Sequence, residues 1–251
     1  MKLKNKIIKS LHERKSVRSF EDKTLSPKVK RTLFKAATQA PTAGNQQLYS
    51  MIDITDPELK AKLAVLCDNQ GFITKAPMVV IFLADCSRWL SYYELAGLTA
   101  RKPAVGDLLL AVSDATIAAQ NMVVAAQSLE LGSCYIGDVM EHCEEMRTAL
   151  NLPPYVFPCT MLVIGHPTPS QLTREKPKRF PLKTVVMENG YNPLPSEKLI
   201  STYEKSRGKK NPNFDFTNHV TTFCKRKYES EFSLEMSRSV ATYLKEFMSE
   251  E

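Results

Sequence analysis

The 251-residue chain lacks most of the short motifs that reveal a catalytic or nucleotide-binding site in a sequence. Its nine glycines include no G-x-G pair, so the fingerprint of a Rossmann dinucleotide-binding site is absent. Gly132 and Gly137 have the spacing of a P-loop, but Asp138 stands where the P-loop needs its lysine. Neither H-E-x-x-H nor G-x-S-x-G occurs, which argues against a zinc hydrolase and an α/β-hydrolase. Such a chain is expected when a bound cofactor carries the chemistry.

Patterns typical of disulfide frameworks and metal sites are absent as well. The six cysteines include no C-x-x-C pair, and the four histidines are scattered along the chain. We therefore expect reduced, mostly buried thiols and no bound metal.

Segments that would direct the chain to a membrane are also missing. No long apolar run follows residues 1–6, so no signal peptide is expected. The longest apolar stretch, residues 108–131, contains Asp114 and Asn121, which favours a buried helix over a membrane span. We expect both side chains to be buried polar groups of an interface rather than catalytic groups. The sequence thus predicts a cytoplasmic protein that contacts no membrane.

The chain does contain a dense cluster of cations and hydroxyls near its start, in the run R-K-S-V-R-S-F at residues 14–20. Arginine offers a planar fork of donors to a phosphate group, lysine a point charge and serine a hydroxyl. The formal net charge of +7 also favours anionic ligands in general. A basic cluster is more often a solvated surface, so this run alone does not establish a phosphate site.

Helical and strand-like segments alternate along the chain, which predicts an α+β or mixed α/β layered fold. The apolar run 78–83 predicts a strand buried on both faces, and residues 107–131 predict a long core or interface helix. The prolines after His166 predict an extended arm, followed by two helices, the last at about 233–248. The other expected elements are helices at 5–14, from Pro27 toward Pro41, from Asp56 and at 141–150, and strands at 48–54, 133–136 and 159–165.

Four motifs in a fixed order resemble the FMN-dependent nitroreductase family. Residues 14–20 resemble its opening R-x-S-x-R-x-[FY] signature, and residues 40–47 resemble its A-P-[ST]-x-x-N-x-Q loop. Gly132-Ser133-Cys134-Tyr135-Ile136-Gly137 follows the apolar helix as in the family, and Gly165-His166-Pro167 with Lys176-Pro177-Lys178-Arg179 resembles its closing motif. Each motif alone is weak evidence, whereas four in the right order are strong.

The resemblance implies an α+β homodimer with a central mixed, mostly antiparallel sheet flanked by helices and a C-terminal arm that extends onto the dimer partner. We expect residues 1–191 to form the FMN-binding domain and residues 192–251 to form a helical extension that packs on the dimer. The apolar helix 107–131 is the natural dimer interface.

The resemblance also implies which residues bind FMN, the group expected to carry the chemistry in place of catalytic side chains. Arg14 and Arg18 would hold its phosphate, Ser16 would bind the phosphate or the ribityl chain, and Lys15 would approach the ring or the ribityl hydroxyls. A cation near the pyrimidine end of the ring stabilises the reduced, anionic flavin. Contacts from the partner subunit to the ring or ribityl chain are implied for the loop residues Pro41, Thr42, Asn45 and Gln47.

Further contacts are implied along the rest of the chain. Gln70 stands where some relatives place an amide against the ring. Backbone of Tyr135, Ile136, Gly137 and Asp138 would face the ring near its reactive N5 atom. Lys178 and Arg179 would complete the phosphate site. Arg207, in the basic run 206–210, resembles a contact to the 2′-phosphate of NADPH.

The activity implied is reduction of nitroaromatics, quinones or related flat electrophiles by ping-pong hydride transfer from NAD(P)H. One alternative keeps the flavin but acts on another substrate, through flavin reduction, dehalogenation or ene reduction, because a fold does not determine its substrate. Another is a basic nucleic-acid-binding protein that uses residues 14–18 and 225–227. The aromatic residues are not interleaved with these basic residues, so we expect no nucleic-acid partner.

Overall fold

The computed structural model describes residues 5–207 and 213–248. The chain divides into two compact units, the first made of residues 1–174 with 235–251 and the second of residues 175–234. The first unit thus ends before residue 191, the expected boundary, and it also includes the C-terminal segment 235–251. That the last sixty residues extend over a dimer partner stays a prediction.

The first unit is built on a four-stranded sheet in the order β1-β2-β4-β3, in which every neighbouring pair is antiparallel. At its centre, Ile81 of β2 faces Met161 of β4, with Ile52 of β1 and Ile136 of β3 on either side. The strands are β1 (Tyr49–Asp53), β2 (Met78–Asp85), β3 (Gly132–Ile136) and β4 (Val156–Gly165). Every residue of β2 and β4 is buried, which confirms the strand predicted to be covered on both faces.

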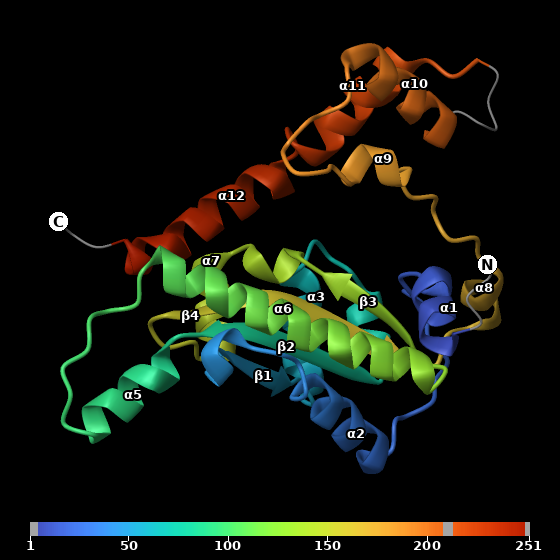
Figure 1. The fold of residues 1–251 in the computed structure, drawn as a ribbon. Helices are drawn as coiled ribbons and strands as arrows, with labels where there is room; N and C mark the ends of the chain where they lie inside the picture. The colour runs from blue at the N-terminus through green and yellow to red at the C-terminus, as the bar shows by residue number, and fades with distance from the viewer. Residues whose placement is uncertain (1–4, 208–212, 249–251) are drawn as a thin grey trace. The chain divides into compact units, whose positions relative to one another are not determined.

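Alternate side chains of β2 enter two separate hydrophobic cores, because successive residues of a strand point to opposite faces. Val80 and Phe82 pack with the helix α6 (Val105–Ser128), which crosses one face of the sheet (Figure 1). Val79 and Ile81 belong to the core on the other face. That core is covered by α3 (Pro57–Leu66), α4 (Phe72–Lys75) and α7 (Cys143–Leu150).

Helix α6 meets the sheet through small residues and carries large apolar residues elsewhere. Ala111, Ala115 and Ala118 are fully buried, whereas Leu109 and Leu110 are 62% and 50% exposed. By length and composition alone the helix could cross a membrane, but core helices of globular proteins pass the same test. Its packing on all four strands identifies it as the central core helix of this unit.

The C-terminal segment closes the first unit. Tyr243 of α12 (Glu231–Leu244) and Phe247 of the following 3₁₀ turn η3 (Lys245–Phe247) are buried. Their rings make edge-to-face contacts with Phe157 and Tyr155, at centroid distances of 5.1 and 5.5 Å. An ion pair of 2.7 Å between Arg147 and Glu246 seals the end of this segment.

Most predicted helices are present, with caps of the expected chemistry. Asn5, Ser26 and Asp56 accept hydrogen bonds from the first turns of α1 (Lys6–Glu13), α2 (Pro27–Ala37) and α3. The remaining elements are α5 (Ser87–Leu95), α8 (Pro169–Thr173), α9 (Leu182–Val185), α10 (Ser196–Arg207), α11 (Phe216–Lys227) and the 3₁₀ turns η1 (Ala43–Asn45) and η2 (Asp138–Met140).

Two expectations from the sequence were wrong. The tail contains three helices rather than two, and α5 was not expected at all. Neither α5 nor α11 contributes a buried residue to a core.

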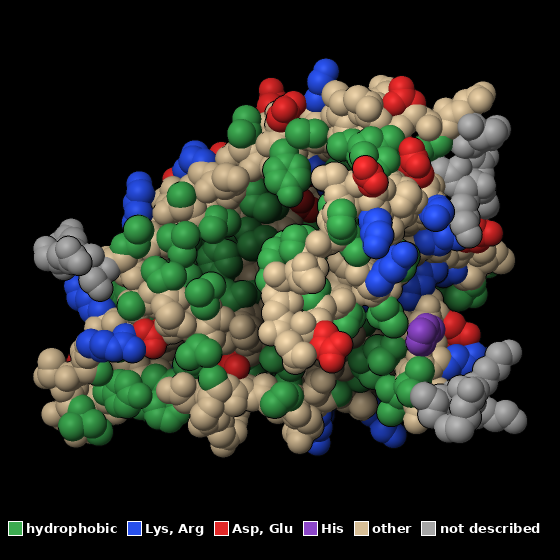
Figure 2. Space-filling view, turned by 45° about the horizontal axis from the view of Figure 1, so that its top comes forward, with side chains coloured by type: hydrophobic (Ala, Val, Ile, Leu, Met, Phe, Trp, Pro, Cys, Tyr) green, Lys and Arg blue, Asp and Glu red, His purple; other side chains and the backbone are tan. Residues whose placement is uncertain are grey.

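The second unit has a small aromatic core of its own. The ring of Tyr203 contacts those of Phe180, Phe214, Phe216 and His219, at centroid distances from 5.5 to 6.4 Å. The Tyr203 hydroxyl also lies 3.0 Å from Nδ1 of His219. Figure 2 shows hydrophobic and charged side chains interspersed over the face it presents, with Lys and Arg side chains gathered toward its right.

Candidate functional site

The N-terminal cation cluster lies along the edge strand β3. Ser16 forms an isolated parallel bridge with Ser133, and the amide of Val17 donates to the Ser133 carbonyl at 2.9 Å. This approach requires glycine at position 132, since a Cβ there would lie only 2.6 Å from the Val17 side chain. The sequence around the cluster therefore holds residues 14–18 against the end of the sheet.

The cations of this cluster converge on one small region. The Arg14 guanidinium lies 5.6 Å above the centre of the Tyr135 ring, and its Nε is buried without a hydrogen-bond partner. Burial raises the pKa of the Cys134 thiol, while Arg18, a hydrogen bond with Ser16, and Arg14 oppose that shift. An unpaired buried donor among several cations is a suitable place for an anion.

Arg174 is a member of this cluster that sequence reasoning missed. Its guanidinium donates to the Ser16 carbonyl, and its positive charge acts on the Cys134 thiol. The Lys15 ammonium donates to the carbonyls of Leu172, at 2.8 Å, and Arg174. Lys15 thus holds the segment that presents Arg174, a function that the motif at residues 14–20 does not reveal.

The other predicted cations lie in the second unit. Lys178 and Arg179 are exposed and line a cavity of about 480 Å³, and that they complete a flavin phosphate site stays a prediction. Three more lysines line the same cavity: Lys183, Lys198 and Lys205. Arg207 ends α10 with its guanidinium 5.6 Å above the Phe180 ring, whereas residues 208–210 of the predicted basic run lie outside the described residues.

The predicted loop around Pro41 is held by a buried carboxylate of helix α6. Asp114, 3% exposed, accepts from the amides of Ala43 at 3.0 Å and Leu48 at 3.2 Å, one at each end of the loop. The amide of Gln47 donates to Thr42 Oγ1 at 3.2 Å, which closes the loop on itself. Asp114 therefore has a structural role in keeping the loop in shape.

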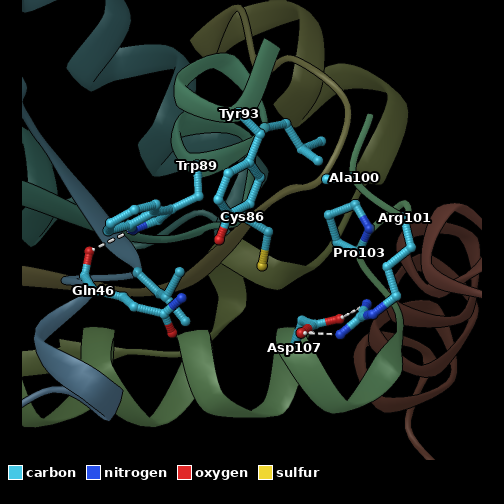
Figure 3. Close-up of a pocket in the computed structure, with 10 residues that line it drawn as sticks. Gln46, Cys86, Trp89, Tyr93, Ala100, Arg101, Pro103 and Asp107 are labelled. Atoms are coloured by element: carbon cyan, nitrogen blue, oxygen red, sulfur yellow. Dashed lines mark hydrogen bonds and ion pairs between the residues drawn. The ribbon is translucent and has the colours of Figure 1, made fainter. Parts of the chain in front are cut away.

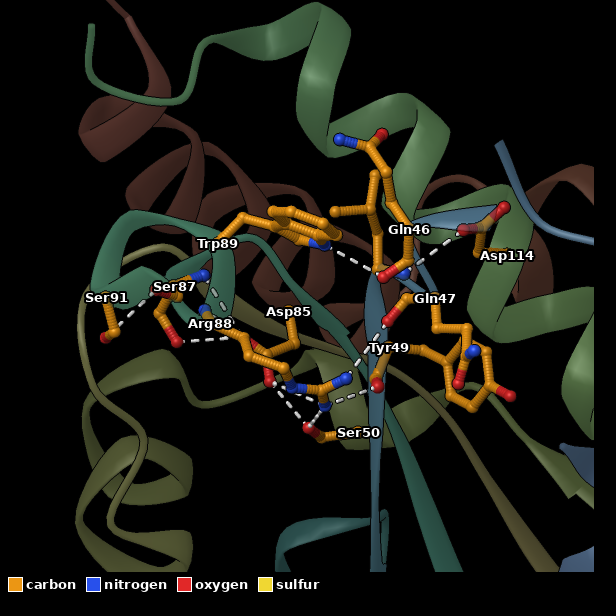
Figure 4. A network of polar contacts seen from close by, with 11 residues as sticks. Gln46, Gln47, Tyr49, Ser50, Asp85, Ser87, Arg88, Trp89, Ser91 and Asp114 are labelled. Carbon is orange, nitrogen blue, oxygen red and sulfur yellow. Dashed lines mark hydrogen bonds and ion pairs between the residues drawn. The ribbon is translucent and has the colours of Figure 1, made fainter. Parts of the chain in front are cut away.

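Helix α5 holds the same loop from its other side (Figure 4). Trp89 Nε1 donates to the Gln46 carbonyl at 2.9 Å, and Arg88 donates to the Gln47 carbonyl at 3.3 Å. Burial acts to raise the pKa of Asp85, but hydrogen bonds from Ser50 and Ser87 and the charge of Arg88 outweigh it and lower that pKa. The resulting Asp85–Arg88 pair orients the guanidinium toward the loop.

A cavity of about 350 Å³ lies beside this loop (Figure 3). Trp89 and Tyr93 supply aromatic walls, and the Arg101–Asp107 pair, with hydrogen bonds of 2.6 and 2.9 Å, borders it. Burial raises the pKa of Cys86 in its wall to about 12, so that thiol is neutral. The cavity shares no lining residue with the predicted FMN contacts.

Two residues predicted separately for the flavin ring are in direct contact. Gln70 Nε2 donates to Asp138 Oδ2 at 2.5 Å and to the Cys67 carbonyl at 2.9 Å. Gly137 has room for a side chain, because a Cβ there would meet only Met140, at 3.7 Å. The packing of this chain therefore does not by itself require glycine at that position.

The neighbouring strand residues are firmly held. The Tyr135 hydroxyl donates to Gln120 Oε1 at 3.1 Å, and burial raises the pKa of Tyr135 to about 12 despite the opposing charge of Arg14. Ile136 is buried, and its carbonyl accepts from Thr160 Oγ1 at 3.4 Å.

The cysteines and the possible metal ligands can be located directly in the described residues. All six cysteines are free and five are buried, as the sequence predicted. Within residues 5–207 and 213–248 no group of three or more His, Cys, Asp or Glu side chains could hold a metal ion.

Comparison with known proteins gives a consistent result. A model described as the nitroreductase family matches residues 11–166. The FMN reductase (NADPH) of Bacillus subtilis is 32% identical over 234 residues, which cover 89% of this chain and 93% of that protein. The oxygen-insensitive NADPH nitroreductase of Salmonella typhimurium is 30% identical over 191 residues, or 76% of each chain. A solved nitroreductase structure from B. subtilis matches with a TM-score of 0.78 at 30% identity, covering 93% of this chain and 98% of that one. The chain belongs to the nitroreductase family.

Proposed function

We propose that this protein is an FMN-dependent oxidoreductase that takes electrons from NAD(P)H and reduces small electron acceptors. The family match and relatives named as an FMN reductase (NADPH) and an NADPH nitroreductase support this activity. The observation that carries the proposal is the buried, unpaired Nε of Arg14 beside Ser16, Arg18 and Arg174. Arg14, Ser16 and Arg18 lie within the segment that matches the family, and Arg174 follows it, so together they would offer a site for an anion.

In this proposal Arg14, Ser16, Arg18 and Arg174 hold the phosphate of FMN. Arginine suits this role because its donors match phosphate oxygens in a fork and it stays charged at any relevant pH. Bound there, FMN would supply the hydride chemistry that links the nicotinamide donor to the acceptor. The protein contributes binding, orientation and the cations that favour a negatively charged reduced flavin.

We further propose that the working form is a homodimer formed on the outer face of α6. Leu109 and Leu110 are exposed on that helix, and burying them against a second copy would remove apolar surface from water. Asp114, on the same helix, holds the loop with Thr42, Asn45 and Gln47, the residues predicted to reach the flavin of the partner. A second copy on this face would therefore place a preformed loop at the interface.

The acceptors proposed are nitroaromatics, quinones and related flat electrophiles. A relative from Pseudomonas named Cr(VI) reductase, 32% identical over 77% of this chain, indicates that acceptors vary among relatives. Flavin reduction, dehalogenation or ene reduction in the same fold is the alternative. We propose a cytoplasmic location, with no membrane or nucleic-acid partner.

The first test is an absorbance spectrum of the purified protein before and after addition of NADPH. Flavin bands that bleach on addition of NADPH are expected, and reappear when a quinone or nitroaromatic acceptor is added. A colourless protein that takes up no added FMN would contradict the proposal, and the cation cluster would then be a surface patch.

A further inference from the structure

Glu141 is a buried acid beside the predicted ring contacts, and no expectation from the sequence includes it. Its residue is only 2% exposed, and its Oε1 has no hydrogen-bond partner. Its amide donates to the Asp138 carbonyl at 3.0 Å, which closes the 3₁₀ turn η2 and brings the two side chains together. Asp138 acts on the Glu141 carboxyl through its charge and through a side-chain hydrogen bond, and both raise the pKa of that carboxyl.

Two carboxyl groups in hydrogen-bond contact share one proton, because both cannot ionise at low cost. Burial raises the pKa of Glu141 to about 8, and the charge and hydrogen bond of Asp138 add to that shift. Asp68 after α3 and Glu235 of α12 raise it further. At neutral pH the Glu141 carboxyl therefore keeps its proton, which it can donate to Asp138.

The charged groups on the neighbouring elements do not remove this proton. Glu235 pairs with Arg238 at 2.8 Å and lies 3.6 Å from Nδ1 of His142. Arg238 also pairs with Glu144 on α7, at 2.8 Å. Arg238 is already paired with two other carboxylates, so it does not compensate a negative charge on Glu141.

The orientation of Gln70 depends on this pair. Both hydrogens of its amide nitrogen are used, one by Asp138 Oδ2 and one by the Cys67 carbonyl. A flipped amide would place oxygen against two acceptors, so the observed orientation is the stable one. Its remaining polar atom, Oε1, is then fixed in direction by Asp138, which is in turn held by Glu141.

We propose that Glu141 is a positioning residue of the flavin site: the proton it shares with Asp138 holds Asp138 against Gln70, and loss of that proton in alkaline solution loosens FMN binding. The inference rests on the proposed function, because Gln70 and Asp138 are FMN contacts only in that proposal. Above the transition two adjacent carboxylates repel each other, which displaces η2 and releases the Gln70 amide.

The test measures FMN affinity of the apoprotein by flavin fluorescence, at pH values on either side of 8. Release of one proton weakens wild-type binding by up to roughly tenfold per pH unit above the transition. Glu141→Gln keeps a hydrogen-bond donor for Asp138 but cannot ionise, so its affinity should stay high and lose this pH dependence. Glu145→Gln, an exposed glutamate of α7, is the matched control and should behave as wild type. Equal pH dependence in wild type and Glu141→Gln would overturn the proposal.

A second measurement needs no flavin. The raised pKa means that the folded protein binds this proton more tightly than the unfolded chain, whose glutamate has an ordinary pKa of 4.5. Its stabilisation is complete below about pH 4.5 and is lost as the pH rises through about 8. The unfolding midpoint of wild type should therefore fall relative to Glu141→Gln over that range.

The two measurements separate the possible failures. If wild type binds no FMN at any pH while the stability difference is present, the proposed function fails and the shared proton stands. If FMN binds and the stability difference is absent, the positioning role of Glu141 is refuted and the proposed function stands.

Discussion

At the scale of single residues, mutation can show which cations complete the proposed anion site, Arg174 or the later residues Lys178 and Arg179. Arg174 contacts the backbone of Ser16, whereas Lys178 lines a cavity of the second unit. We expect Arg174→Ala to weaken FMN binding about 10- to 100-fold, since losing a hydrogen bond to a charged group costs about 1.5–3 kcal/mol. Lys178→Ala should have a much smaller effect. Fluorescence titration of FMN into both variants measures the two effects, and the opposite order would support the assignment of Lys178 made from the sequence.

Arg207 is the second residue whose role can be isolated. It lies in the unit with the lysine-rich cavity, and its guanidinium stacks on Phe180, so it is held in place but retains donors for a phosphate. Arg207→Ala should raise the KM for NADPH by roughly tenfold and leave the KM for NADH nearly unchanged, because only NADPH carries the 2′-phosphate. Arg226→Ala, which removes a similar arginine stacked on Phe223, is the control. An equal change in the KM for both nucleotides would contradict the assignment of Arg207 to the 2′-phosphate.

At the scale of elements, the loop that begins at Pro41 is held by a buried carboxylate of α6 as well as by contacts from α5. Asp114 accepts from the amides of both Ala43 and Leu48, and an asparagine could offer an oxygen to only one of them. Asp114→Asn should therefore destabilise the protein by about 1–3 kcal/mol and reduce FMN retention, because one buried amide loses its partner. Thermal unfolding and flavin content measure the two effects. Asp22→Asn, on an exposed position, should change neither.

The sequence predicted well those elements whose apolar residue pattern reflects their burial. Strand β2 is a continuous apolar run because both its faces are covered, and α6 is apolar because it packs on the whole sheet. Helix α5 contributes no buried residue, and its role lies in polar contacts from Arg88 and Trp89. Such contacts depend on where the chain folds back, which no local pattern records.

The same distinction holds for the site. Arg14 lies over the Tyr135 ring near Ser16, and Gln70 contacts Asp138 directly, whereas their contacts to FMN stay predictions. Arg174 could not be assigned from the sequence, because its contact with Ser16 depends on the path of the chain through the short helix α8 that precedes it. Glu141 could not be assigned for another reason: the sequence does not show whether a glutamate is buried or exposed to solvent.

At the scale of the whole molecule, the dimer cannot be tested by removing the tail. Cutting the chain after Tyr191 would delete Tyr243 and Phe247, which fill the core of the first unit. Losing a buried aromatic side chain costs about 3–5 kcal/mol, so the shortened chain would lose stability whether or not it forms a dimer. The proposed interface therefore has to be tested by substituting a side chain that is exposed in the isolated subunit.

Leu109 meets that requirement, since it is 62% exposed on the outer face of α6. A glutamate there costs the isolated subunit little, but burying its charge against a second copy would be strongly unfavourable. We expect Leu109→Glu to be folded and monomeric in sedimentation experiments and to lose most of its FMN, because the partner's loop no longer covers the flavin. Val65→Glu, which is 61% exposed on α3 over the opposite face of the sheet, should remain dimeric and yellow. A Leu109→Glu protein that stays dimeric would move the interface away from α6, and a monomer that keeps its FMN would show that one subunit is enough to hold it.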